Sequence, residues 1–182
     1  YYPVERFLSY FTDGLITINE EDYRRTQRFH AKKTILISGV GINLEKFQKE
    51  EPTRNQLRKR NSISDQTIVL MSVGELSKRK NHIVVIEALE QLKEQDIVYV
   101  ICGVGPMERE LQNKAKKLGV SEKLKLVGFR SDIPELHKIA DIFVFPSLQE
   151  GLPVALMEAM ASGLPIVASR IRGNEDLIQN NS

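Results

Sequence analysis

Two carboxylates and a helix start lie close together in the segment SLQEGLPVALMEAMASG, which runs from Ser147 to Gly163. Glu150 falls in the loop and Glu158 in the helix that follows, with seven residues between them. The first turn of a helix carries backbone N–H groups without internal partners, and these groups and the helix dipole attract anions. A carboxylate can accept hydrogen bonds from two sugar or ribose hydroxyls. The segment therefore predicts a ligand with both hydroxyls and phosphate, such as a sugar nucleotide.

A lysine in a second glycine-containing loop is a candidate phosphate contact. Gly74 follows the predicted strand Thr67–Val73, and Lys80 stands just before a helix start, where its ammonium can meet a phosphate as a point charge. The simpler interpretation is a surface lysine in a basic run with Lys78 and Arg79. Both interpretations stay open at the level of the sequence.

The other candidates also have simpler explanations. Glycine at Gly103 and Gly105 permits close approach of a ligand, but a tight strand-to-helix turn explains both equally well. No third glycine completes the dinucleotide fingerprint. Read alone, Glu150 is a loop acid and Glu158 lies on an exposed helix face. The pair beside an anion-attracting helix start is more specific than either residue.

The elements that would position these residues alternate between strand-like and helix-like segments, which indicates a doubly wound α/β domain with a parallel sheet. In such sheets ligands bind at the carboxyl ends of the strands. The predicted strands are Thr67–Val73, Ile97–Cys102, Leu124–Val127, Ile142–Phe145 and Pro165–Ser169. The loops that follow them hold most of the glycines in this region, and Glu150.

Helix boundaries are predicted from capping residues. Asn19 and Asn81 are expected to cap the helices that follow them, and Gly119 is expected to end one. Pro134 suits the first turn of a short helix. The segment Asn174–Ile178 is expected to begin another helix.

The N-terminal part predicts a separate, incomplete unit. A helix over Val4–Phe11 and strands over Gly14–Ile18 and Thr34–Ser38 make a small β-α-β piece that would leave apolar surface in water. The segment Gly39–Asn43 breaks the pattern. We therefore predict a remnant of one domain over residues 1–43 and a second domain over residues 44–182.

Composition narrows the function classes. The 182-residue chain is 41% hydrophobic with a formal charge of +2, which is too small to imply a nucleic-acid partner. Lysine and arginine outnumber acids between Arg24 and Arg60. This bias indicates a solvated surface or attraction to an anionic substrate or acidic lipid headgroups. No apolar run has the length of a membrane span. The chain begins with Tyr1 and not with methionine, so no targeting segment is inferred from its first residues.

Few residues suggest metal or nucleophile chemistry. Cys102 is the only cysteine, which excludes an intrachain disulfide, and it is expected in the core. His30, His82 and His137 have no adjacent nucleophile pattern and are expected to be structural or solvated. The absence of D-x-D, H-E-x-x-H and C-x-x-C motifs suggests no metal site.

Nearly the whole chain resembles the family 4 glycosyltransferases, of the bacterial capsule or exopolysaccharide type. The segments that carry the resemblance are VGELSKRKNH from Val73, ICGVGPMERELQ from Ile101, VGFRSDIPEL from Val127 and PSLQEGLPVALMEAMASGLPIVAS from Pro146. TDGLITINEEDY from Thr12 and ISGVGINLEKF from Ile37 resemble the end of the family's N-terminal domain and the crossing into its C-terminal one. The resemblance implies a GT-B fold of two Rossmann-like domains and a retaining transferase that uses a nucleotide sugar without metal or cofactor.

The resemblance also implies residue roles. Glu150 would be the catalytic candidate that contacts the donor sugar, and Glu158 would hold the ribose hydroxyls. Lys80 would neutralise the leaving diphosphate. The other implied donor contacts are Gly74 in the loop of Lys80, Gly103 and Gly105 beside the nucleotide, Arg130 beside the base, and the backbone of Gly151, Leu152, Pro153 and Val154 beside the phosphates and sugar.

Departures from the family keep alternatives open. Glu75 stands where many members carry an arginine that binds diphosphate, and Arg79 is a candidate replacement. By the resemblance, most of the N-terminal acceptor domain and the C-terminal tail would lie outside this sequence. The expected partners are a nucleotide-diphosphate sugar, a saccharide or lipid-linked acceptor and the missing domain, in the cytoplasm or at the inner membrane face. The alternatives are a sugar-nucleotide 2-epimerase and a non-catalytic nucleotide-binding or protein-interaction module.

Overall fold

The computed structural model describes residues 2–37 and 41–178, which form two compact units. The described parts of Tyr1–Gly41, Glu150–Val154 and Arg170–Ser182 make up the first unit. Ile42–Gln149 and Ala155–Ser169 make up the second unit. The division into an acceptor-domain remnant over residues 1–43 and a donor domain over residues 44–182 stays a prediction.

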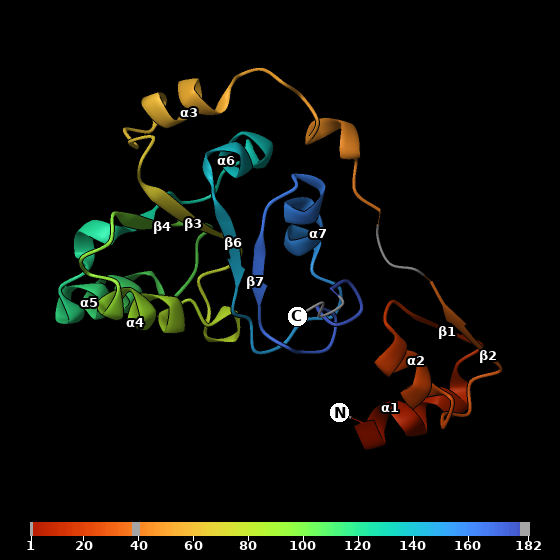
Figure 1. Ribbon diagram of the computed structural model, residues 1–182. Helices are drawn as coiled ribbons and strands as arrows, with labels where there is room; N and C mark the ends of the chain where they lie inside the picture. Colours follow the sequence, from red (N-terminus) through yellow and green to blue (C-terminus); the bar gives the residue numbers. More distant parts are fainter. Residues whose placement is uncertain (1, 38–40, 179–182) are drawn as a thin grey trace. The chain divides into compact units, whose positions relative to one another are not determined.

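The second unit is built on a parallel sheet of five strands (Figure 1). Its strands are β3 (Ile68–Val73), β4 (Ile97–Cys102), β5 (Leu124–Leu126), β6 (Ile142–Phe145) and β7 (Ile166–Ala168). They lie in the order β5-β4-β3-β6-β7, and every neighbouring pair is parallel. The chain moves outward in one direction from β3 and then returns to the other side of it at β6. The predicted doubly wound α/β sheet is confirmed, and its topological switch point lies between β3 and β6.

Both faces of this sheet are covered by helices, as Figure 1 shows. Side chains alternate across β4, so Tyr99 and Ile101 face one core while Val98 and Val100 face the other. Helices α4 (Ile83–Gln91) and α5 (Glu108–Leu118) cover the first core, and α3 (Arg54–Arg60) and α6 (Ile133–Ile139) cover the second. Cys102 belongs to the second core, as predicted.

Most predicted helix ends are confirmed. Asn19 caps α2 (Glu20–Thr26) by accepting a hydrogen bond from the Asp22 N–H, and Gly119 ends α5 with φ 69°. The prediction for Asn81 is wrong, because His82 is the N-cap residue of α4 and makes no side-chain capping bond. Asn81 instead ends the 3-10 helix η3 (Lys78–Lys80) with φ 53°. Asparagine is one of the few residues that tolerate this left-handed conformation.

A buried arginine joins α3 to the start of β6. Arg58 is only 1% exposed, and its Nη2 donates to Asp141 Oδ2 at 2.6 Å. Its remaining donors bind backbone carbonyls, including that of Ile139. Asp141 also accepts from the Val69 N–H at 2.8 Å and from Arg54 at 2.5 Å. Burial would raise the pKa of Asp141, but these donors and positive charges hold it below its ordinary value.

We expect Asp141→Asn to lower the free energy of unfolding by about 2 kcal/mol near neutral pH, because it leaves the buried Arg58 charge without a counter-charge. This loss is smaller than that for a fully buried ion pair, because Asp141 is 34% exposed and water screens its charge. A lowered pKa in the folded state adds stability above the ordinary carboxyl pKa of about 4, and this stability is lost as pH falls through the lowered value. Urea unfolding from neutral pH towards about pH 3 should therefore bring the two proteins together. A constant difference across this range would contradict the assignment.

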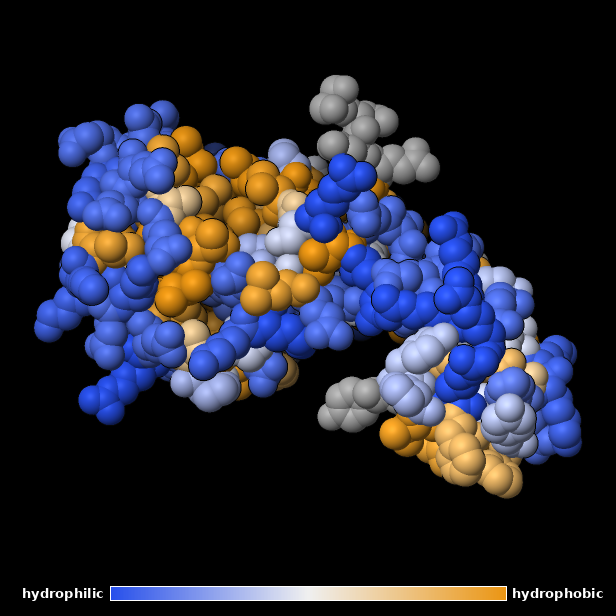
Figure 2. All heavy atoms as spheres, turned by 90° about the horizontal axis from the view of Figure 1, so that it is seen from below, coloured by the Kyte–Doolittle hydropathy of each residue, from blue (hydrophilic) through white to orange (hydrophobic). Residues whose placement is uncertain are grey.

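The first unit contains α1 (Tyr2–Leu8), the 3-10 helix η1 (Ser9–Phe11), β1 (Gly14–Thr17), α2 and β2 (Lys33–Leu36). Strands β1 and β2 pair in parallel. Hydrophobic side chains stay exposed on this unit (Figure 2). Phe7 and Phe11, for example, are 63% and 79% accessible. The predicted apolar exposure is confirmed.

Two predictions at element ends have other outcomes. Residues 38–40 lie outside the described residues. They include the end of the predicted strand Thr34–Ser38 and the start of the predicted break Gly39–Asn43. The expected helix over Asn174–Ile178 is wrong, because this segment forms turns. The short 3-10 helices η2 (Leu44–Lys46) and η4 (Ser121–Lys123) complete the described elements. None of the described helices is long and apolar enough to cross a membrane.

Candidate donor-binding site

The loops that follow β3 and β4 pack so closely that two positions have no room for a side chain. A Cβ atom on Gly103 would lie 1.8 Å from the Gly74 carbonyl oxygen, and one on Gly105 would lie 2.5 Å from the Leu76 carbonyl oxygen. The Leu76 N–H donates to the Val104 carbonyl at 3.0 Å. Neighbouring backbone alone thus requires these glycines. Contact of Gly103 and Gly105 with a nucleotide stays a prediction.

Lys80 lies at the switch point of the sheet. Its aliphatic stem runs beside Gly74, where an added Cβ would lie 3.1 Å from Lys80 Cε. Its Nζ lies 4.7 Å from the ring centroid of Phe145, the last residue of β6. The stem thus packs on the end of β3 and the ammonium on the end of β6. The electrons of the Phe145 ring face attract the positive charge of Lys80. The structure brings Gly74 and Lys80 together where doubly wound sheets bind ligands.

Backbone hydrogen bonds join the loop of Lys80 to the loop after β6. The Leu148 N–H donates to the Arg79 carbonyl at 2.8 Å, and Arg79 Nη1 donates to the Gln149 carbonyl at 3.0 Å. Between these contacts and β6, Ser147 is fully buried, and its Oγ has no hydrogen-bond partner among the described residues. Sequence reasoning missed Ser147, although a small polar residue directly after a strand-ending Pro146 was the available signal.

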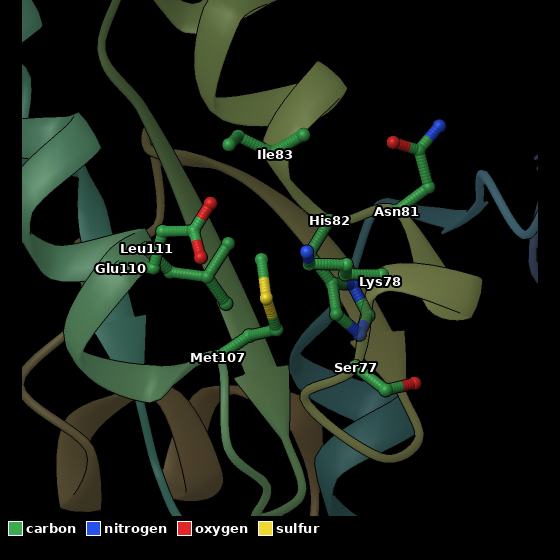
Figure 3. Close-up of a pocket in the computed structure, with 8 residues that line it drawn as sticks. All are labelled: Ser77, Lys78, Asn81, His82, Ile83, Met107, Glu110 and Leu111. Carbon is green, nitrogen blue, oxygen red and sulfur yellow. The ribbon is translucent and has the colours of Figure 1, made fainter.

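A cavity of about 180 Å³ is lined in part by Ser77, Lys78 and Asn81, which flank Lys80 in the sequence (Figure 3). Met107 and Glu110, at the start of α5, face Lys78 and His82 across it. His82 is 3% exposed, and its Nε2 has no hydrogen-bond partner among the described residues. Burial, with a smaller contribution from the nearby Lys80 charge, lowers the pKa of His82 to about 4, so the imidazole is neutral at neutral pH.

Glu158 lies in α7 (Val154–Ala161), between the fully buried Leu156 and Ala159. It is half-buried, so the interpretation as an ordinary exposed helix position does not hold. Burial raises the pKa of its carboxyl group, and the Lys46 charge lowers it in part. The Ser162 hydroxyl donates to the Glu158 carbonyl at 3.0 Å.

A second buried histidine supports the end of α7. His137 Nδ1 lies 2.8 Å from the Ser162 hydroxyl and its pKa is lowered to about 4 by burial. Its ring contacts Phe143 edge-on, with 5.6 Å between centroids. His30 stacks on Tyr10 with centroids 3.8 Å apart. The sequence predicted that the three histidines are structural or solvated, and in the structure all three make packing contacts.

The loop that holds Glu150 belongs to the first unit. Glu150 is 7% exposed. Gly173, with φ 83°, packs on this loop so closely that an added Cβ would lie 2.2 Å from the Gly151 carbonyl oxygen. Pro153 is buried, and Val154 begins α7 with 41% exposure. Leu152 is half-buried between them.

Arg130 follows β5, the strand at the edge of the sheet. Its Nε donates to Asp132 Oδ1 at 2.7 Å, and its Nη2 contacts Asp132 Oδ2. This pairing lowers the pKa of Asp132. This pairing fixes the plane of the Arg130 guanidinium. Contact of Arg130 with a nucleotide base stays a prediction. No group of three His, Cys, Asp or Glu side chains in the described part of the chain is arranged for a metal ion.

The strand order and the position of the glycine loops define a Rossmann-like α/β domain. A model of the family glycosyl transferases group 1 matches residues 53–182. The chain belongs to this family.

Relatives by sequence support the assignment. The chain is 40% identical over 185 residues to EpsD of Bacillus subtilis (strain 168), a proposed glycosyltransferase, with 99% of the chain and 49% of the relative covered. It is 33% identical over 184 residues to the Escherichia coli UDP-Gal:alpha-D-GlcNAc-diphosphoundecaprenol alpha-1,3-galactosyltransferase, with 97% of the chain and 48% of the relative covered. The chain spans about half the length of these relatives.

Solved structures share the fold. Anabaena Alr3699/HepE, in complex with UDP and glucose, superposes with a TM-score of 0.86 at 22% identity, covering 98% of this chain and 50% of that one. WaaG, a glycosyltransferase involved in lipopolysaccharide biosynthesis, gives a TM-score of 0.77 at 25% identity over 87% of this chain and 45% of that one. These likenesses assign a GT-B fold, with the five-stranded sheet as its Rossmann-like C-terminal half.

Proposed function

We propose that this chain supplies the donor site of a retaining, family 4 glycosyltransferase that moves a sugar from a nucleotide diphosphate to a saccharide or lipid-linked acceptor. The observation that carries the proposal is the position of Lys80, whose ammonium lies over Phe145 at the switch point. A cation at that place offsets the charge that develops on a diphosphate leaving group. Relatives that act on UDP-galactose or crystallise with UDP favour UDP as the nucleotide.

Each candidate residue receives one role in this proposal. Glu150 accepts hydrogen bonds from the donor sugar, and Glu158 accepts them from the ribose hydroxyls. The Gly151–Val154 backbone binds sugar and phosphate through N–H groups at the start of α7. Arg130 lies beside the base. No metal or cofactor takes part, since the lysine supplies the positive charge.

The alternatives differ in chemistry. A sugar-nucleotide 2-epimerase would convert the donor without any acceptor, whereas the relatives are named for transfer. A non-catalytic module would bind nucleotide without turnover. We expect this chain by itself to bind nucleotide and not to turn over. For the whole protein, we propose that a separate domain binds the acceptor. We also propose that the protein lies in the cytoplasm and contacts the inner face of the membrane.

Titration calorimetry of this chain with UDP, GDP and ADP tests the proposal. We expect one diphosphate, UDP, to bind more tightly than the others. Folded protein that binds none of the three would overturn the donor-site assignment. Incubation of the whole protein with UDP-sugar alone separates the enzyme classes, because an epimerised donor would identify the epimerase.

We expect Glu158→Ala to weaken UDP binding by about 1.5–3 kcal/mol, because charged hydrogen bonds to the ribose hydroxyls are lost. Binding of 2′-deoxy-UDP should be weak in both proteins, since it lacks one of those hydroxyls. Glu122→Ala, at an exposed position in η4, is the control and should bind UDP normally. An equal loss of affinity for both nucleotides in Glu158→Ala would remove the ribose role.

A further inference from the structure

A chain of buried side-chain hydrogen bonds runs beneath the switch point. The Ser72 hydroxyl on β3 donates to the Val144 carbonyl of β6 at 2.5 Å. Tyr99 Oη, on β4, lies 2.7 Å from Ser72 Oγ and 3.0 Å from His82 Nδ1. Ser72 and Tyr99 are fully buried, and His82 is 3% exposed. These hydrogen bonds link three strands of the sheet to His82, the N-cap residue of α4.

The number of protons fixes the direction of each hydrogen bond. Ser72 has one hydroxyl proton and donates it to Val144, so its oxygen accepts from Tyr99. Tyr99 has then used its only proton, so its oxygen accepts from the Nδ1–H of His82. The imidazole is therefore held as the Nδ1–H tautomer, and loss of either hydroxyl leaves a buried donor unpaired.

Only Asn81 separates His82 from Lys80, and its backbone is fixed. Asn81 adopts φ 53°, and its N–H donates to the Lys78 carbonyl at 3.2 Å. The Lys80 N–H donates to the Ser77 carbonyl at 3.1 Å. With so short a connection, the direction in which Lys80 leaves the backbone depends on where the imidazole is anchored.

We propose that His82, anchored through Tyr99 to Ser72, is a positioning residue that holds Lys80 over Phe145 to meet the donor diphosphate. The proposal rests on the proposed donor site. It predicts an effect on the diphosphate rather than on the nucleoside, because Lys80 is the group being positioned. The useful quantity is therefore the ratio of UDP affinity to uridine affinity.

Calorimetry of this chain with UDP and with uridine tests the proposal. We expect Tyr99→Phe to lower the UDP-to-uridine ratio about fivefold, with uridine binding unchanged. Val98→Ala is the matched control, since Val98 is buried in the same strand but faces the opposite core. It should cost stability and leave the ratio unchanged. A Tyr99→Phe protein with the normal ratio would overturn the proposal.

Substitutions of His82 test the hydrogen-bond direction. The amide N–H of His82→Asn stands near the place of Nδ1 and can still donate to Tyr99, whereas His82→Gln carries its amide further out, near Nε2. We expect the asparagine variant to keep most of the ratio and the glutamine variant to lose it. Equal ratios in the two variants would contradict the proposal.

A double-mutant cycle shows whether the effect passes through Lys80. In a Lys80→Met background, Tyr99→Phe should cause no further loss of the ratio, because no ammonium remains to be positioned. If Tyr99→Phe lowers the UDP-to-uridine ratio by the same factor with and without Lys80, the proposal is overturned. If Lys80→Met alone leaves the ratio unchanged, the diphosphate role of Lys80 fails and the positioning role fails with it. If only Tyr99→Phe is without effect, the donor site stands and the positioning role alone is removed.

Discussion

In Lys80→Met we expect UDP affinity to fall about 100-fold, roughly 3 kcal/mol, while uridine affinity stays the same. The ammonium is the group that the fold sets at the switch point, and its charge-assisted hydrogen bonds to a diphosphate are the strong kind. Methionine keeps an unbranched stem beside Gly74 and Phe145, so packing changes little. The loss is therefore one of charge.

Lys78→Met is the control for this prediction, because Lys78 is an exposed member of the same basic run. It removes the same net charge two residues away and should change UDP affinity by less than about threefold at moderate salt. Titration calorimetry at two salt concentrations measures both variants. Equal losses in the two would mean that Lys80 is only part of a solvated basic surface.

In Gly103→Ala we expect a loss of stability of about 3 kcal/mol or more. The added Cβ would lie 1.8 Å from the Gly74 carbonyl oxygen, which belongs to backbone and cannot rotate away. Either the β3 loop or the β4 loop must move, and overpacking of this kind is costly. Because Gly74 lies beside Lys80, the variant should also lose UDP affinity in whatever fraction folds.

Gly128→Ala separates backbone conformation from collision. Gly128 has φ 69°, but an added Cβ would meet nothing within 4 Å. Its expected cost is therefore only the left-handed strain of about 1–2 kcal/mol. Urea unfolding compares the two proteins. If Gly103→Ala is no less stable than Gly128→Ala, the close packing of the two loops is not a constraint.

The regular part of the fold could be predicted from the sequence. The apolar strands and the helical stripes between them indicate a parallel sheet, and the strands Ile97–Cys102 and Ile142–Phe145 are predicted with the bounds that the structure has. These features depend on local periodicity and capping. Asn81 shows where local rules fail, because asparagine suits both an N-cap and a left-handed helix end, and the fixed course of the chain into α4 selected the second.

The sequence by itself determined the sheet, the candidate acids, the lysine and the positions of the glycine loops, since each is a matter of residue type and spacing. Only the tertiary structure decided what those residues touch. It showed that Gly103 is required by the Gly74 backbone, and that His82 is tied through Tyr99 to Ser72. These residues are far apart in sequence, and strand order, which no local pattern encodes, brings them together.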